Sequence, residues 1–190
     1  MNGRGRVLLI ALLVWIGPLP LFAEIDSLPL PPPPENYRIP NVPFIPPTLH
    51  DSATGALASV LSFWGKPLEG QDLPGAEAFI HPKGTAYANL ERTVRSRGLD
   101  LWLYRGSLAD LRNHLTMNHP VIAFLGEGTG DDPEEASVVV TGYDDRNRKI
   151  TAHSPTGPNR SLTYDAFVEK WAGADFLTLL ILPREPMKGP

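Results

Sequence analysis

Apolar residues between positions 41 and 184 follow helical and strand spacings in alternation along the chain. A spacing of three to four residues predicts four helices, at 52–64, 85–97, 108–115 and 163–171. Short apolar or alternating runs predict strands at 41–45, 101–104, 121–125, 138–143, 149–153 and 176–182. Because helices dominate the first part and antiparallel strands the last, the predicted fold class is α+β.

Local signals mark where the predicted helices begin and end. Ser107 and Thr163 are suited to cap the third and fourth helices, since their hydroxyl groups can accept a backbone N–H bond. Gly65 and Gly98 end the first two, because glycine readily adopts the left-handed conformation that follows a helix. These signals support one domain over residues 41–184.

The first 23 residues have the layout of a secretory signal peptide. Arg4 and Arg6 precede an apolar run at 7–16, and Ala23 offers a small residue before a cleavage site. A membrane anchor is the alternative, but it needs about 20 apolar residues, and Pro18 interrupts the run well before that length. We therefore expect a periplasmic or secreted protein.

Prolines dominate the segment that follows the signal. Residues 24–40 include four consecutive prolines at 31–34, which fix φ and remove backbone donors. We expect an extended, disordered proline-rich arm that acts as a spacer, or alternatively one that docks into the aromatic groove of a partner. Residues 185–190 are expected to form an unstructured tail.

Charge and composition exclude several function classes. The net charge is −4, from 17 basic and 21 acidic residues, so the chain lacks the basic surface that binds nucleic acid. It has no cysteine, which excludes disulfides and thiolate metal sites. Its histidines do not follow a metal-ligand spacing, so we expect neither a metal nor another cofactor.

The order of these segments resembles a known enzyme family. The chain is similar to the papain-like peptidases that trim double-glycine leaders, which are family thirty-nine of the cysteine peptidases. The matching segments are 42–46, 56–65, 83–85, 97–99, 107–111, 119–122, 138–144 and 167–171. The resemblance implies a papain-like fold, with a helical half packed on an antiparallel sheet.

The positions that carry catalysis in that family differ here. By this resemblance, Pro47 stands for the glutamine that stabilises the oxyanion, and Ser52 for the cysteine nucleophile at the start of a helix. Ala136 or Ser137 takes the place of the histidine, and Ser154 that of the orienting acid. A serine without a base is a poor nucleophile. No catalytic residue of the family is therefore intact.

Other residues could in principle rebuild a serine centre. His50 and His153 are the candidate bases, but His50 is too near Ser52 along the chain to align predictably. His153 neighbours the acid position, and neighbouring residues of a strand point to opposite faces. We expect Asp51, Ser137 and His153 to line the remaining cleft instead.

Three functional interpretations remain open. The first is an exported pseudopeptidase that binds an extended peptide or exported protein as an adaptor in secretion or envelope assembly, as the resemblance to non-catalytic, exporter-fused members implies. The alternative is an active double-glycine-type peptidase with Ser52 as its nucleophile. A purely structural partner that docks through its proline arm is a third interpretation.

The signal layout makes a prediction about processing. We expect protein from an envelope fraction to begin just after Ala23, which N-terminal sequencing or intact mass measurement checks. A full-length chain that retains Met1 in the cytosol would contradict export.

Overall fold

The computed structural model describes residues 32–47, 52–68, 84–126 and 137–184. Its helices are α1 (Ser52–Phe63), α3 (Thr85–Ser96), α4 (Leu108–Thr116) and α5 (Tyr164–Gly173). Its strands are β1 (Asn36–Arg38), β2 (Leu99–Arg105), β3 (Val121–Phe124), β4 (Ser137–Asp144), β5 (Lys149–Ser154), β6 (Gly157–Thr163) and β7 (Leu177–Pro183). The predicted signal peptide, the first part of the arm (24–31) and the tail lie outside the described residues.

The strands of the described residues form one antiparallel sheet in the order β2-β7-β3-β4-β5-β6. Strand β4 is long enough to have two neighbours on the same edge. Its first half pairs with β3, and its second half, from Gly142 to Asp144, pairs with β1. Strand β1 thus continues the edge where β3 ends.

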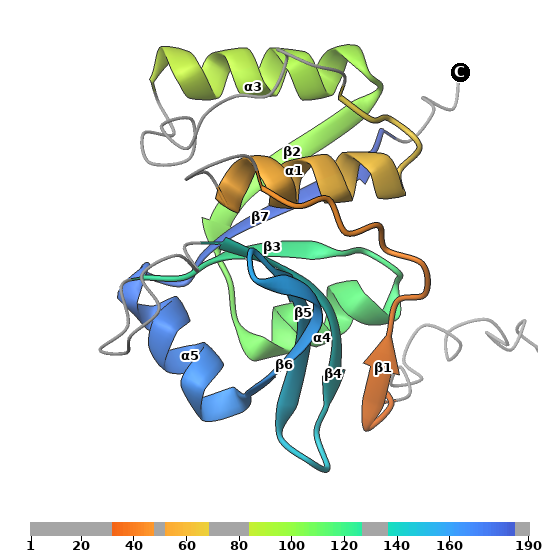
Figure 1. The fold of residues 1–190 in the computed structure, drawn as a ribbon. Helices are drawn as coiled ribbons and strands as arrows, with labels where there is room; N and C mark the ends of the chain where they lie inside the picture. Colours follow the sequence, from red (N-terminus) through yellow and green to blue (C-terminus); the bar gives the residue numbers. More distant parts are fainter. Residues whose placement is uncertain (1–31, 48–51, 69–83, 127–136, 185–190) are drawn as a thin grey trace, which may run out of the picture. The chain divides into compact units, whose positions relative to one another are not determined.

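Side-chain alternation along the central strands divides the core between the two faces of the sheet. Ile122, Val139 and Leu179 face the cluster that contains α1 and α3, whereas their neighbours Val121, Val140 and Leu180 belong to the cluster with α4 and α5. In Figure 1, α1 and α3 lie above β3, and α4 and α5 lie below it. The sheet is therefore the middle layer of three.

Helix α1 is buried on every side rather than along one stripe. All nine residues from Ala53 to Leu61 are buried. Four of the nine are alanine or glycine, which lets neighbouring segments approach the helix backbone closely. The sequence predicted a helix with one apolar stripe here. The small residues on its other sides are also buried, so the helix is covered all round.

The structure confirms the fold class and the main local signals. Ser52 begins α1, and the apolar run at 138–143 lies in β4. The Ser107 hydroxyl accepts the N–H of Asp110 at 3.1 Å, and Thr163 accepts that of Ala166 at 3.2 Å. None of the helices among the described residues is long and apolar enough to cross a membrane.

Two expectations at the N-terminal side are wrong. Residues 41–45 form no strand, and residues 36–38, which were assigned to the disordered arm, form β1. The carbonyl of Pro34 accepts the hydroxyl of Tyr143 at 2.7 Å, and that of Glu35 accepts the N–H of Asp145 at 2.8 Å. The ordered part of the chain therefore begins before residue 41, because β4 supplies partners that the local sequence does not reveal.

Strand β6 was not predicted from the sequence. This strand is mostly exposed and contains Gly157, Pro158 and Asn159, so it lacks the alternating apolar residues that predict a strand. Its pairing with β5 defines it instead. The final helix still begins at the predicted place, one residue after Thr163.

The pairing of β1 with β4 depends on the absence of a side chain at Gly142. A Cβ there would lie 2.8 Å from the carbonyl oxygen of Tyr37 and 3.1 Å from the Cβ of Arg38. We expect Gly142→Ala to force the strands apart and lower the free energy of unfolding by about 1–3 kcal/mol, measured by urea unfolding. Gly173→Ala is the matched control, since its Cβ would meet nothing nearer than 3.4 Å. Equal stability of the two variants would contradict this role of Gly142.

Candidate functional site

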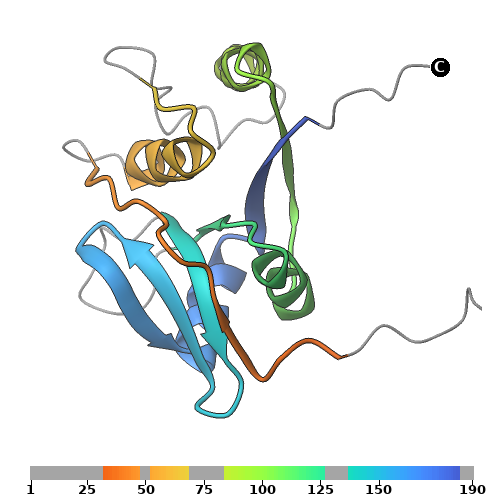
Figure 2. The ribbon, with the colours of Figure 1, turned by 90° about the vertical axis from the view of Figure 1, so that its right-hand side faces the viewer.

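An irregular segment, residues 42–47, runs from the side of β1 towards α1. Figure 2 shows it continuing from β1 along β4 and up to α1. The Ser59 hydroxyl donates to the carbonyl of Gly55 at 2.8 Å and accepts the N–H of Ile45 at 3.0 Å. One buried hydroxyl therefore ties this segment to the helix.

Pro47 packs directly against the helix at Gly55. A Cβ at Gly55 would lie 2.9 Å from the Cα and N atoms of Pro47 and equally close to the carbonyl oxygen of Ile45. The resemblance places an oxyanion-binding donor at Pro47, but proline has no backbone N–H and no polar side chain. This position fills space instead of donating a hydrogen bond.

The side chain of Ser52, at the start of α1, faces the first residue of β4. The hydroxyl of Ser137 donates to the Ser52 hydroxyl oxygen at 2.9 Å, and Ser137 is 2% exposed. The sequence left Ala136 and Ser137 as alternatives for the histidine position, and the structure brings Ser137 to Ser52. Ala136 lies outside the described residues, as do His50 and Asp51.

His153 has both ring nitrogens engaged with the backbone. Its Nδ1 accepts the N–H of Asn159 at 3.1 Å, so its Nε2 carries the proton and donates to the carbonyl of Val42 at 3.0 Å. The Phe44 ring packs edge-on against the imidazole, with centroids 5.8 Å apart. Burial lowers the pKa of His153, the bond to Val42 opposes this, and the positive charge of Arg38 lowers it further.

Ser154 is buried and bonds to a neighbour on its own turn. Its hydroxyl lies 2.8 Å from the hydroxyl of Thr156. The pairing of β5 with β6 shifts register between Ala152 and Ser154, and such a bulge interrupts the alternation of side chains. For this reason His153 and Ser154 both line the same cavity, contrary to the expectation that they face opposite sides.

These residues enclose a cavity that is almost completely filled. We call it the Ser52 cavity; its walls include Pro47, Ser52, Ser137, His153 and Ser154, and its volume is about 10 Å³. A single water needs ~10–15 Å³ of such space. Every sequence-predicted site residue that the structure describes therefore meets here, but the space left between them suits one water at most.

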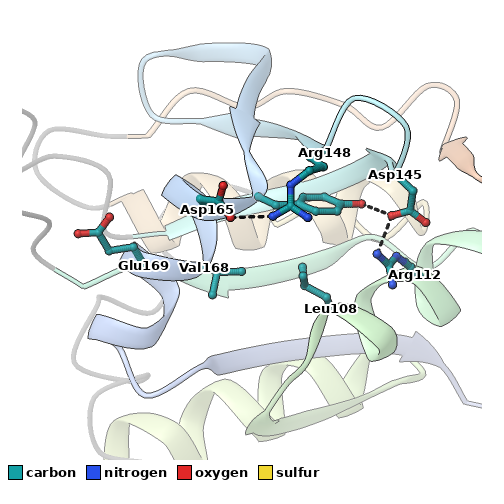
Figure 3. Close-up of a pocket in the computed structure, with 8 residues that line it drawn as sticks. Leu108, Arg112, Asp145, Arg148, Asp165, Val168 and Glu169 are labelled. Carbon is teal, nitrogen blue, oxygen red and sulfur yellow. Dashed lines mark hydrogen bonds and ion pairs between the residues drawn. The ribbon is translucent and has the colours of Figure 1, made fainter.

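Two larger pockets lie elsewhere in the described residues. The Tyr164 pocket has a volume of about 560 Å³ and contains residues of α4, α5 and the turn before β5. Figure 3 shows that each of its two arginines lies against an aspartate, while Glu169 stands apart from both pairs. Arg112 bonds to Asp145 at 2.6 Å and Arg148 to Asp165 at 2.7 Å.

Tyr164 joins the same network of charges. Its hydroxyl donates to the carboxylate of Asp145 at 2.5 Å, while the guanidinium groups of Arg112 and Arg148 each lie 5.7 Å from its ring centre. Burial, followed by the hydrogen bond to Asp145, raises the pKa of Tyr164 to about 12. These interactions connect α4, α5 and the turn between β4 and β5, and this structural role accounts for the cluster of charges.

The second larger pocket adjoins the Ser52 cavity. The Arg38 pocket has a volume of about 420 Å³; its walls include Arg38, Asn41, Val42, Thr141, His153 and Asn159. His153 also lines the Ser52 cavity, so the two spaces share a wall. Sequence reasoning found neither this pocket nor the roles of Gly55 and Ser59, because all of them depend on how segment 38–47 crosses the sheet.

Comparison with known protein families shows to which family the chain belongs. The model of the Peptidase C39-like family matches residues 53–178, well over half of the sequence. The chain belongs to the Peptidase C39-like family. Among curated proteins, no sequence matches it.

Solved structures of Peptidase C39-like proteins share this fold. A putative C39-like peptidase from Bacillus anthracis superposes with a TM-score of 0.57 at 15% identity, over 80% of this chain and 100% of that one. The peptidase domain of Streptococcus ComA, a bifunctional ABC transporter involved in quorum sensing, gives 0.50 at 17% identity, over 74% and 97%. A double-glycine motif protease from an AMS/PCAT transporter, in complex with the leader peptide, also gives 0.50 at 17%, over 77% and 94%.

The buried imidazole makes stability depend on pH. Because folding lowers the pKa of His153, protonation favours the unfolded chain. His153 therefore contributes stability above the ordinary histidine pKa and loses it as the pH falls through the lowered value. We expect the fall in unfolding free energy between about pH 7.5 and about pH 5 to be smaller in His153→Gln than in the wild type.

Urea unfolding at both pH values measures this difference. Burial lowers the pKa of His114 and His119 as well. A His119→Gln variant therefore shows how much of the pH dependence of stability comes from His119. A His153→Gln protein with the full wild-type pH dependence would show that His153 titrates normally in the fold.

Proposed function

We propose that this Peptidase C39-like protein is an exported, non-catalytic member that binds an extended peptide or a segment of an exported protein. The observation that carries the proposal is the contact between the hydroxyls of Ser52 and Ser137. Where a peptidase needs a nucleophile beside a base, two hydroxyl groups bond to each other.

The chemistry of this pair argues against activation of Ser52. A base must accept the serine proton during attack, and the hydroxyl of Ser137, which lies 2.9 Å from that of Ser52, is far too weak a base to do so. His153 is the imidazole on the wall of this cavity, and both of its nitrogens are engaged with Asn159 and Val42. To serve as a base it would first have to break a backbone bond.

The binding half of the proposal draws on the shape of the site. Extended peptides bind through main-chain hydrogen bonds and side-chain pockets, neither of which requires a nucleophile. The Ser52 cavity is too small for a peptide residue, but the Arg38 pocket next to it is open and much larger. An exported location, as the predicted signal at 1–23 suggests, would bring the protein to peptides that leave the cell.

A paired assay tests both halves. Purified protein is incubated with synthetic double-glycine leader peptides; mass spectrometry follows cleavage, and fluorescence anisotropy follows binding. We expect binding without turnover, and equal binding by the Ser52→Ala variant, because the Ser52 cavity does not receive the peptide. Ser161→Ala, an exposed serine on β6, is the matched control.

Two outcomes would count against the proposal. Turnover that Ser52→Ala abolishes would establish a serine peptidase. Failure of every leader or exported peptide to bind would remove the binding function. A Ser52→Cys variant is expected to remain inactive despite the thiol at a helix N-terminus, since catalytic residues act as a unit and the base would still be absent.

A further inference from the structure

The Arg38 pocket differs from the Tyr164 pocket in its charge. In the Tyr164 pocket both arginines face carboxylates within hydrogen-bond distance. Arg38 is the one charged residue among those that line its own pocket, and no carboxylate of the described residues forms an ion pair with it. A ligand with a negative charge would complete this pocket, whereas the arginines of the other are already paired and Glu169 adds a further negative charge there.

Two amide side chains complement the guanidinium. Asn41 and Asn159 line the same pocket as Arg38, and their side chains form no hydrogen bond within the described part of the chain. Both residues are exposed and have positive φ, 57° and 54°; Asn41 lies in a turn and Asn159 in β6. Guanidinium and amide N–H groups are donors that match the oxygens of a carboxylate.

The backbone around these donors is fixed before any ligand arrives. The N–H of Ile39 bonds to the carbonyl of Thr141 at 2.8 Å, while His153 links Val42 to Asn159. The absence of a side chain at Gly142 lets β1 and Arg38 lie close over β4. A preorganised site of this kind loses less entropy on binding than a flexible one.

We propose that the Arg38 pocket binds the carboxylate of a peptide, an inference that rests on the peptide-binding function proposed above and assigns it a specific contact. Arg38 supplies the charge, Asn41 and Asn159 supply amide donors, and Val42 provides an apolar wall. The carboxylate can come from a peptide C-terminus or from an acidic side chain.

Small probes separate these two sources. N-acetyl-Gly-Gly carries only a C-terminal carboxylate, its amide carries none, and N-acetyl-Asp-amide carries only a side-chain carboxylate. Titrations of the isotope-labelled protein by two-dimensional NMR yield dissociation constants and identify the perturbed residues. We expect shifts at residues 38–42 and 159 with one or both acids, and at least about tenfold weaker binding of the neutral amide.

Arg38→Gln tests the charge itself. It should weaken acid binding about tenfold and remove the preference over the amide, while Arg38→Lys should retain part of it. Arg146→Gln, at the turn between β4 and β5, makes the same charge change away from the pocket and should bind like the wild type. Circular dichroism and thermal unfolding check that each variant folds.

The outcomes distinguish this inference from the proposed function. If leader peptides bind but acids and amides bind equally and Arg38→Gln changes nothing, the carboxylate site is wrong and peptide binding stands. If the small acids bind in an Arg38-dependent way but no peptide does, the site stands and the peptide function fails. Shifts that Arg146→Gln reduces as much as Arg38→Gln would indicate a general charge effect and overturn the site.

Discussion

The complete burial of helix α1 is the constraint on which the rest of this structure depends. A helix covered on all sides must allow other backbones to approach it closely, and its alanines and glycine permit this on the side of segment 42–47. At Gly55 the approach leaves no space for a Cβ. The same packing sets the start of the helix opposite the start of β4, so that Ser52 meets Ser137. The site geometry thus follows from core packing, whatever side chains occupy the positions.

This separation of scaffold from chemistry means that a Peptidase C39-like fold does not by itself determine which residues occupy the site. The packing around α1 is dense, and a change there costs stability. The side chains that face the cavity carry less of the core. The buried hydroxyl of Ser137, for example, has its hydrogen-bonding requirement satisfied by Ser52. Fold similarity therefore identifies the scaffold, and the residues in the cavity must be judged on their own.

The sequence predicted those parts of the fold that local signals determine. Caps at Ser107 and Thr163 and the apolar run in β4 depend on neighbours a few residues away, and the structure confirms them. Strand β1 lies between Pro34 and Pro40 and is held by a distant strand, so local composition indicated an arm. Strand β6 is similarly defined by pairing and not by its own pattern. Long-range register is the information that a single sequence does not display.

The candidate site shows the same limit at the level of one residue. The sequence placed Ser154 at the site and His153 on the opposite face, whereas both line the Ser52 cavity, because the register shift between Ala152 and Ser154 cannot be read from alternation. Its chemistry then follows from its two backbone bonds. An imidazole that holds Val42 with one nitrogen and Asn159 with the other secures the segment between β1 and α1 only while both bonds persist. Accepting a proton on Nδ1 would break the bond from Asn159. His153 thus holds the segment between β1 and α1 in place, with the Arg38 pocket directly beside it.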